Sequence, residues 1–176
     1  MPKRYYGIDD FLASQPVKKG RTLVVGSKCY GDKKDRRQCY DDAVGLDMEE
    51  GQGVDIVHDF EKPLSVDDGV FDHIDCCSVL EHVQRPWKMA ENIESVMKPG
   101  STVLLQVPYV WRVHNYPGDY WRFTIQSFDI LFPNIKWLQR GYLMGNIYRK
   151  MPNSLHVDGK KYMQRSEATG FGVFVP

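Results

Sequence analysis

Residues 71–108 of the chain read FDHIDCCSVLEHVQRPWKMAENIESVMKPGSTVLLQVP, and this stretch decides the fold. Its first eight residues, 71–78, form an apolar run that predicts a buried strand. Apolar residues then recur every three or four positions over residues 86–97, which predicts a helix that opens on a proline. Residues 98–100, Lys-Pro-Gly, end that helix with a glycine suited to a left-handed cap. Residues 102–107 predict a second strand, and a strand–helix–strand unit of this kind forms a parallel crossover in an open α/β sheet.

The same stretch resembles a known family. Its motifs, in chain order, are Phe71-Asp72, Ser78-Val79-Leu80-Glu81-His82-Val83, Met97-Lys98-Pro99-Gly100 and Val107-Pro108. They are similar to those of class I, Rossmann-like S-adenosylmethionine-dependent methyltransferases of the methyltransferase 11 type. The resemblance implies a mostly parallel α/β sheet with an antiparallel C-terminal strand. It also implies an enzyme that uses S-adenosyl-L-methionine as its cofactor.

Composition sets limits on the partners. The 176 residues suffice for one domain with a sizeable core, and their formal net charge is zero. A neutral chain creates no global field that attracts nucleic acid, so a nucleic-acid substrate is disfavoured. No apolar run approaches the roughly 20 residues that a membrane span needs, and the first residues lack the apolar core of a signal peptide. The sequence therefore predicts a cytoplasmic protein without a membrane partner, and it does not indicate an oligomeric state.

Four cysteines, Cys29, Cys39, Cys76 and Cys77, show no C-x-x-C spacing. Cys76 and Cys77 fall in a predicted buried strand, where small thiols commonly pack. We interpret the four as free thiols of a protein in a reducing compartment, and we expect no metal site.

The first predicted strand, residues 21–26, ends at Gly26, where glycine lets the chain turn sharply beside a ligand. Methyltransferases usually carry further glycines in the loop that follows, but here Lys28 stands near the place of the second. The loop also lacks the G-x-G-x-x-G pattern of dinucleotide-binding folds, which disfavours a nicotinamide-dependent oxidoreductase. The resemblance adds Ser27 and Ser78 as cofactor contacts.

Acidic residues end the next two predicted strands. Asp47 follows the apolar residues 43–46, and a carboxylate there can accept hydrogen bonds from both ribose hydroxyls. The alternative is that Asp47 caps the following turn. For strand 53–60, the resemblance implies that Asp59 accepts from the adenine amino group and that Phe60 packs on the adenine ring. Asp59 is equally compatible with a cap or a loop.

Two connections are unusually short or charged. Only about ten residues separate Phe60 from Phe71, and extended they reach about 33 Å, enough to cross the sheet but not to hold a crossover helix. We therefore predict a trimmed crossover between the third and fourth strands. Residues 32–40, DKKDRRQCY, are predicted to form a short, solvated helix or loop.

An aromatic and polar segment, residues 109–124, follows the predicted fifth strand at the ligand-binding edge of such sheets. It resembles the H-x-x-P-x-D-Y-W-R-F-T signature of some members of the family. We predict His114 as a general base, with Asp119 and Arg122 as further catalytic residues facing the acceptor. His82 is interpreted as bonding the backbone. Thr124 is predicted to cap a helix over residues 125–132.

Residues 136–143 and 171–175 predict an antiparallel pair that closes the sheet, and the intervening 144–169 either covers the site or is an insertion. We assign residues 1–20 to an N-terminal extension, with a short helix, and residues 21–176 to the methyltransferase domain. The predicted function is methyl transfer to an oxygen or nitrogen of a small-molecule or glycan-like acceptor. The alternative is a degenerate methyltransferase fold that acts as a non-catalytic binding or interaction module.

Overall fold

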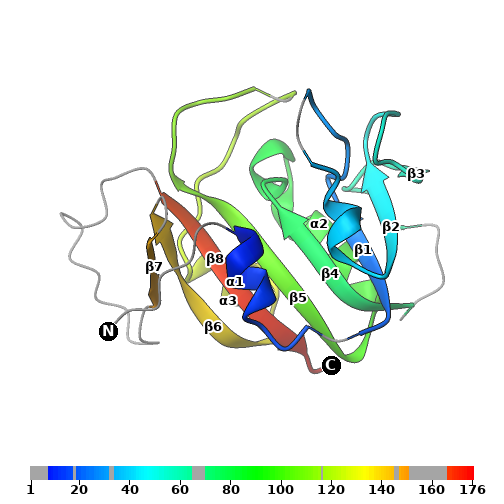
Figure 1. The fold of residues 1–176 in the computed structure, drawn as a ribbon. Coiled ribbons are helices and arrows are strands. Elements are labelled where there is room, and N and C mark those ends of the chain that lie inside the picture. The colour runs from blue at the N-terminus through cyan, green and yellow to red at the C-terminus, as the bar shows by residue number, and fades with distance from the viewer. Residues whose placement is uncertain are drawn as a thin grey trace.

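The computed structural model describes residues 8–17, 19–31, 34–64, 70–115, 117–144, 147–150 and 166–176. The described strands form one eight-stranded sheet in the order β3-β2-β1-β4-β5-β8-β6-β7 (Figure 1). The strands are β1 Arg21–Val25, β2 Asp42–Asp47, β3 Ile56–Val57, β4 Phe71–Cys77, β5 Met97–Val110, β6 Ile135–Met144, β7 Ile147–Lys150 and β8 Ser166–Phe174. The helices are α1 Ile8–Ala13, α2 Pro86–Ser95 and α3 Ser127–Leu131, with short 3-10 helices η1 Arg36–Cys39 and η2 Leu80–His82.

The strand directions confirm the predicted sheet. Strands β3, β2, β1, β4 and β5 pair in parallel. Strand β8 inserts antiparallel between β5 and β6, so the C-terminal strand closes the sheet as predicted. Strand β7 then extends the sheet beyond β6 as an antiparallel edge.

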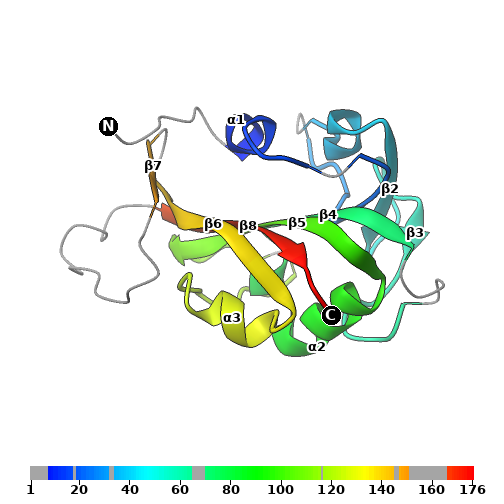
Figure 2. The same ribbon diagram turned by 90° about the horizontal axis from the view of Figure 1, so that it is seen from below.

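The two faces of the sheet have different cover (Figure 2). Helices α2 and α3 lie on one face, and α1 and η1 lie on the other. Among the described residues, no helix has the length and apolar character that crossing a membrane requires.

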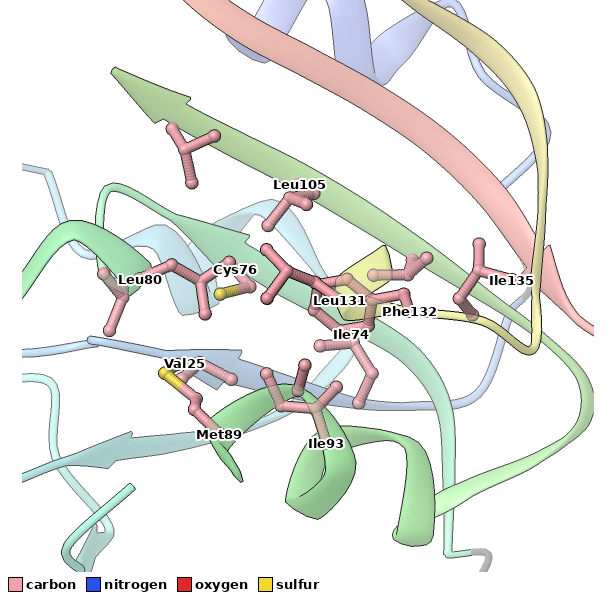
Figure 3. Packing of buried hydrophobic residues seen from close by; sticks show 14 of the residues in the cluster. Val25, Ile74, Cys76, Leu80, Met89, Ile93, Leu105, Leu131, Phe132 and Ile135 are labelled. Carbon is pink, nitrogen blue, oxygen red and sulfur yellow. The ribbon is translucent and has the colours of Figure 1, made fainter. Parts of the chain in front are cut away.

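The main core lies between the sheet and the α2–α3 layer. Figure 3 shows Val25, Ile74 and Leu105 of the central strands directed toward Met89 and Ile93 of α2. The apolar side chains predicted for the helix before β6, Ile125, Phe128, Leu131 and Phe132, are all buried there. The opposite face holds a smaller cluster, in which Phe11 and Leu12 of α1 pack with Leu104, Leu143 and Phe171.

Several boundaries differ from the predictions. Helix α2 ends at Ser95, and Lys98-Pro99-Gly100 belongs to β5 rather than to a helix cap. Gly100 still has a positive φ, 74°, because the strand pairing shifts register there. Helix α3 begins at Ser127, and Thr124 does not cap it. The Thr124 carbonyl instead accepts from the backbone and hydroxyl of Ser127.

Helices are short or absent in the described parts of both connections. Between β1 and β2 the described chain forms only η1, and residues 58–64 after β3 contain no helix. Residues 65–69, in the predicted trimmed crossover, lie outside the described residues, as do residues 151–165 of the 144–169 segment.

The charged run before β2 is not a solvated face. The Arg36 guanidinium reaches across to Asp75 of β4, with Nη2 at 2.6 Å from Oδ2, and its Nη1 bonds Asp9 of α1. Asp75 has a fully buried side chain and also accepts from the Tyr40 hydroxyl at 2.7 Å. Arg36 pairs with Asp75 because a carboxylate that is buried on a central strand needs a partner of opposite charge.

Candidate active site

The parallel strands present their carboxyl ends at one edge of the sheet (Figure 1). The turn after β1, the end of β2, the turn after β4 and the loop after β5 all lie at this edge. Ligands of open α/β sheets bind in this zone. The structure therefore brings the predicted cofactor residues and the predicted acceptor loop to the same edge.

Gly26 turns the chain directly after β1. Its φ is 70°, and a Cβ there would lie 2.4 Å from Cγ2 of Val79 in the turn after β4. The backbone N–H groups of Gly26 and Ser27 both donate to the Leu46 carbonyl, at 2.8 and 3.1 Å. Only glycine satisfies both the backbone angle and the close approach to Val79. The turn after β1 can therefore pack directly against the turn after β4.

Asp47, at the end of β2, is the residue predicted to hold the ribose. Its Oδ2 accepts from the Lys28 backbone N–H at 3.0 Å, and its Oδ1 accepts from the Glu49 N–H at 3.3 Å. Only 8% of the residue is exposed. A carboxylate has about four lone-pair sites, so these two bonds leave acceptor capacity for a diol.

Lys28 stands where the family usually has a second glycine. Its backbone supplies the bond to Asp47, and its ammonium pairs with Glu49 at 2.6 Å. The loop therefore reaches Asp47 without that glycine. The positive φ at Gly26 and the acceptor capacity of Asp47 fit an adenosyl ligand.

Ser78 follows β4 with a φ of 58°, the one described non-glycine residue that has a positive φ. Its side chain is exposed, and its backbone N–H donates to the Gln106 carbonyl of β5 at 2.8 Å. Non-glycine residues in this region are strained and concentrate at functional sites. Ser78 thus remains a candidate cofactor contact.

Asp59 and Phe60, the residues predicted to contact the adenine, have different environments in the structure. The side chain of Asp59 is 39% exposed, and it accepts from the Glu61 N–H and pairs with Lys62 at 3.3 Å. These interactions lower its pKa, the Glu61 bond most of all. Phe60 is buried in the main core, and this placement does not support the predicted packing on adenine.

The loop after β5 is organised around Asp119. Its carboxylate forms a bidentate pair with Arg122, with Oδ2 at 2.8 Å from Nη2, and it accepts from the His114 backbone N–H at 2.7 Å. The hydrogen bonds from Arg122 hold its pKa well below the usual range. Oδ2 also lies 3.2 Å from Nδ1 of His114.

These contacts correct the predicted roles of Asp119 and Arg122. The Asp119 side chain has no exposed surface, so it does not touch an acceptor. The Arg122 donors are directed to Asp119 and to the carbonyls of Arg112 and Trp121. Both residues position His114, whose side chain is 26% exposed. Trp121 packs, with its indole N–H donating to the Val83 carbonyl at 3.0 Å.

Sequence reasoning missed Glu81, which lies in η2. It is 1% exposed, and neither carboxylate oxygen has a hydrogen-bond partner among the residues that the structure describes. Burial raises its pKa to about 8. The Leu80-Glu81-His82 motif was the available signal, but it did not indicate that the loop after β5 folds over this carboxylate.

His82 links the two turns, which confirms its predicted bond to backbone. Its Nδ1 bonds the Gly118 carbonyl, while the Glu81 carbonyl accepts from the Tyr120 N–H at 2.7 Å. The His82 and His114 rings meet edge to face, with centroids 5.0 Å apart. Burial is the main reason that the pKa of His82 is lowered, with the neighbouring His114 adding to the effect.

Comparison with known proteins agrees with this arrangement. Residues 37–105 match the family model of a methyltransferase domain, of the methyltransferase 11 type. No curated protein matches the sequence.

Solved structures share the fold at low identity. A chain of the complex between the Haloferax volcanii Trm112 methyltransferase activator and the putative methyltransferase is 18% identical, with a TM-score of 0.64 over 94% of this chain and 86% of that one. A Burkholderia thailandensis 1,6-didemethyltoxoflavin-N1-methyltransferase, solved with S-adenosylhomocysteine, is 10% identical, with a TM-score of 0.62 over 90% and 72%. An Archaeoglobus fulgidus SAM-dependent methyltransferase is 13% identical, with a TM-score of 0.61 over 94% and 92%.

The fold, with its antiparallel β8 between β5 and β6, and the family match together define a class I, Rossmann-like methyltransferase. The match of residues 37–105 to the methyltransferase 11 model, together with the shared fold, supports an S-adenosylmethionine-dependent methyltransferase. The non-catalytic alternative is not favoured.

Proposed function

We propose that the protein methylates an oxygen or nitrogen of a small-molecule or glycan-like acceptor. The observation that supports this most is the position of the His114 imidazole. It lies beside the Asp119 carboxylate, in the loop after β5, at the same sheet edge as Asp47 and the Gly26 turn. S-adenosylmethionine supplies an electrophilic methyl group when bound. The protein then has to align the acceptor, exclude water and accept a proton.

His114 is the residue that we assign to the acceptor proton. Asp119 lies 3.2 Å from its Nδ1, which favours a proton on that nitrogen and leaves Nε2 as the basic atom. A histidine suits this role near neutral pH. Asp119 and Arg122 fix the ring, and Asp47, Ser27, Ser78 and Asp59 are proposed to hold the cofactor.

We further propose that residues 21–176 form the methyltransferase domain and that residues 1–20 are an extension whose helix α1 docks on the sheet. Four free cysteines, two of them on the central strand β4, suit a reducing cytoplasm.

Calorimetric titration tests the cofactor site. We expect S-adenosylhomocysteine to bind with a dissociation constant in the low-micromolar range or tighter, because the three strand ends offer a turn and carboxylates without a pyrophosphate fingerprint. NAD should give no heat, since the loop after β1 lacks the glycines that pyrophosphate approach needs. Absence of heat with either sulfur cofactor at millimolar concentration would refute the enzyme and restore the non-catalytic alternative.

Replacement of Asp47 by alanine should weaken S-adenosylhomocysteine binding about tenfold to several hundredfold, since each charge-assisted bond to the ribose contributes roughly 1.5–3 kcal/mol. The unliganded protein should also melt at a lower temperature, because the N–H groups of Lys28 and Glu49 lose their acceptor. Asp47→Asn keeps one acceptor oxygen, so its affinity for S-adenosylhomocysteine should lie between those of the wild type and Asp47→Ala. Unchanged affinity in a folded Asp47→Ala protein would remove Asp47 from the cofactor site.

A further inference from the structure

Glu81, His82 and His114 bring three potential metal ligands to one point. Nε2 of His82 lies 3.7 Å from Oε1 of Glu81, and Nε2 of His114 lies 4.0 Å from the same oxygen. All three ligand atoms lie within 4.8 Å of one another. Two ligands at tetrahedral positions around Zn²⁺, each about 2.0–2.1 Å from the ion, are about 3.3 Å apart. The two distances to Oε1 of Glu81, 3.7 and 4.0 Å, exceed that value by 0.4 and 0.7 Å.

The outer contacts of both imidazoles are those of metal-bound histidines. Such histidines almost always donate their second ring N–H to a carboxylate, a backbone carbonyl or water. Here Nδ1 of His114 bonds the Arg112 carbonyl at 3.3 Å and lies 3.2 Å from the Asp119 carboxylate, and Nδ1 of His82 bonds the Gly118 carbonyl. Protons on both Nδ1 atoms leave the two Nε2 lone pairs available, and both Nε2 atoms face Glu81.

Glu81 provides an independent observation. A carboxylate that is 1% exposed would normally be paired, yet neither of its oxygens has a hydrogen-bond partner within the described part of the chain. A buried polar group left unpaired is costly, and a bound cation removes that cost. The unpaired carboxylate of Glu81 and the Nε2 atoms of His82 and His114 thus together offer a set of ligands for a cation.

We propose that Glu81, His82 and His114 bind a divalent first-row transition-metal ion, such as Zn²⁺, Mn²⁺ or Fe²⁺. Two imidazoles and one carboxylate are ligands that these ions accept, whereas Mg²⁺ prefers oxygen ligands and keeps its waters. Three protein ligands leave at least one coordination position open, as in catalytic rather than structural sites.

The site refines the proposed function without depending on it for its test. An open position beside the acceptor loop would take an acceptor oxygen, and coordination lowers the pKa of a bound hydroxyl. The acceptor class that fits is then a hydroxyl compound, with two adjacent oxygens where two positions are open. With the ion bound, Nε2 of His114 would be a ligand and could not accept the acceptor proton. The ion would instead lower the pKa of the acceptor hydroxyl, so that its proton could pass to water before methyl transfer.

Titration of the chelator-treated full chain tests the inference without cofactor or acceptor. We expect one equivalent of Zn²⁺ to bind with micromolar affinity or tighter, and Co²⁺ to give the visible absorption of a nitrogen- and oxygen-ligated site. Mg²⁺ should not compete at similar concentrations. No stoichiometric binding of Zn²⁺, Mn²⁺ or Co²⁺ would overturn the site while leaving cofactor binding, measured separately, untouched.

Variants locate the ion. His114→Ala, on a partly exposed loop, should weaken Zn²⁺ binding at least about tenfold, and Asp119→Asn, which removes a charged partner of His114, should weaken it by about 10–100-fold. His58→Ala is the matched control, since its imidazole bonds the Lys62 carbonyl near β3, and Cys29→Ser controls for an accessible thiol. Glu81→Gln should also lose binding, and if it does not fold, His114→Ala decides. Affinity unchanged by His114→Ala, or lost in either control, would place the ion elsewhere.

Discussion

Replacement of His114 by alanine should lower methyl transfer by about 10²–10⁴, the usual contribution of a positioned general base. Either role given to His114, proton acceptor or metal ligand, requires its Nε2, and alanine removes that atom. Affinity for S-adenosylhomocysteine should change little, because the residue lies in the loop after β5 and not at the Gly26 turn or Asp47. The protein should stay folded, since the side chain is 26% exposed.

The measurement is release of S-adenosylhomocysteine with a panel of small hydroxyl, amine and glycan acceptors. Lys88→Met, at an exposed ion pair on α2, serves as the control and should retain full rate. Asp119→Asn should be intermediate, because it leaves His114 in place but loosens its ring. If His114→Ala retains the wild-type rate with an acceptor that the wild type methylates, the residue has no part in the chemistry.

Replacement of Arg36 by methionine should destabilise the fold by about 3–5 kcal/mol, the usual effect of removing one partner from a buried ion pair. Methionine keeps much of the apolar stem but removes two donors from Oδ2 of Asp75, at 3.0 and 2.6 Å. The Asp75 side chain is fully buried, and among the described residues its Oδ1 has no hydrogen-bond partner. The Tyr40 hydroxyl would remain as a donor to Oδ2.

The midpoint of urea unfolding measures this effect. The double variant Arg36→Met/Asp75→Asn should recover at least half of the loss, because a neutral amide can be buried and can still accept from Tyr40. Lys88→Met breaks an exposed pair and should cost less than about 1 kcal/mol. A loss from Arg36→Met no larger than that of the surface control would show that η1 does not secure β4.

The sheet was largely predictable because β1, β4 and β5 are rich in apolar residues and end at clear boundaries. Residues 71–78 and 102–107 correspond to β4 and β5 within a few residues, and Ala90 and Ile93 of the apolar spacing lie on the buried face of α2. Strand β8 was harder, since its first half, Ser166–Gly170, is polar and rich in small residues. These residues are buried because β5 and β6 flank them on both sides, which no local pattern reveals.

Candidate site residues could be predicted where a single residue, placed just after a strand, is chemically suited to the role by itself. Gly26, Asp47 and His114 are of this kind. The interactions that organise the site were not predictable, because they join segments distant in sequence. Arg36 finds Asp75 across 39 residues, and the loop that carries His114 covers Glu81. The burial of Phe60 in the main core was likewise not visible in the sequence.

The position of β8 in the sheet governs the order in which the chain can assemble. Strand β6 precedes β8 in the chain, yet it is not hydrogen-bonded to β5, and β8 pairs with both. Until Ser166–Phe174 is in place, β5 lacks its antiparallel neighbour, and β6 pairs only with β7 in the described part of the sheet. Such long-range pairing is slow, and exposed strand edges invite association with other chains. Completion of the sheet therefore depends on β8, which joins β5, the strand before the acceptor loop, to the β6–β7 hairpin.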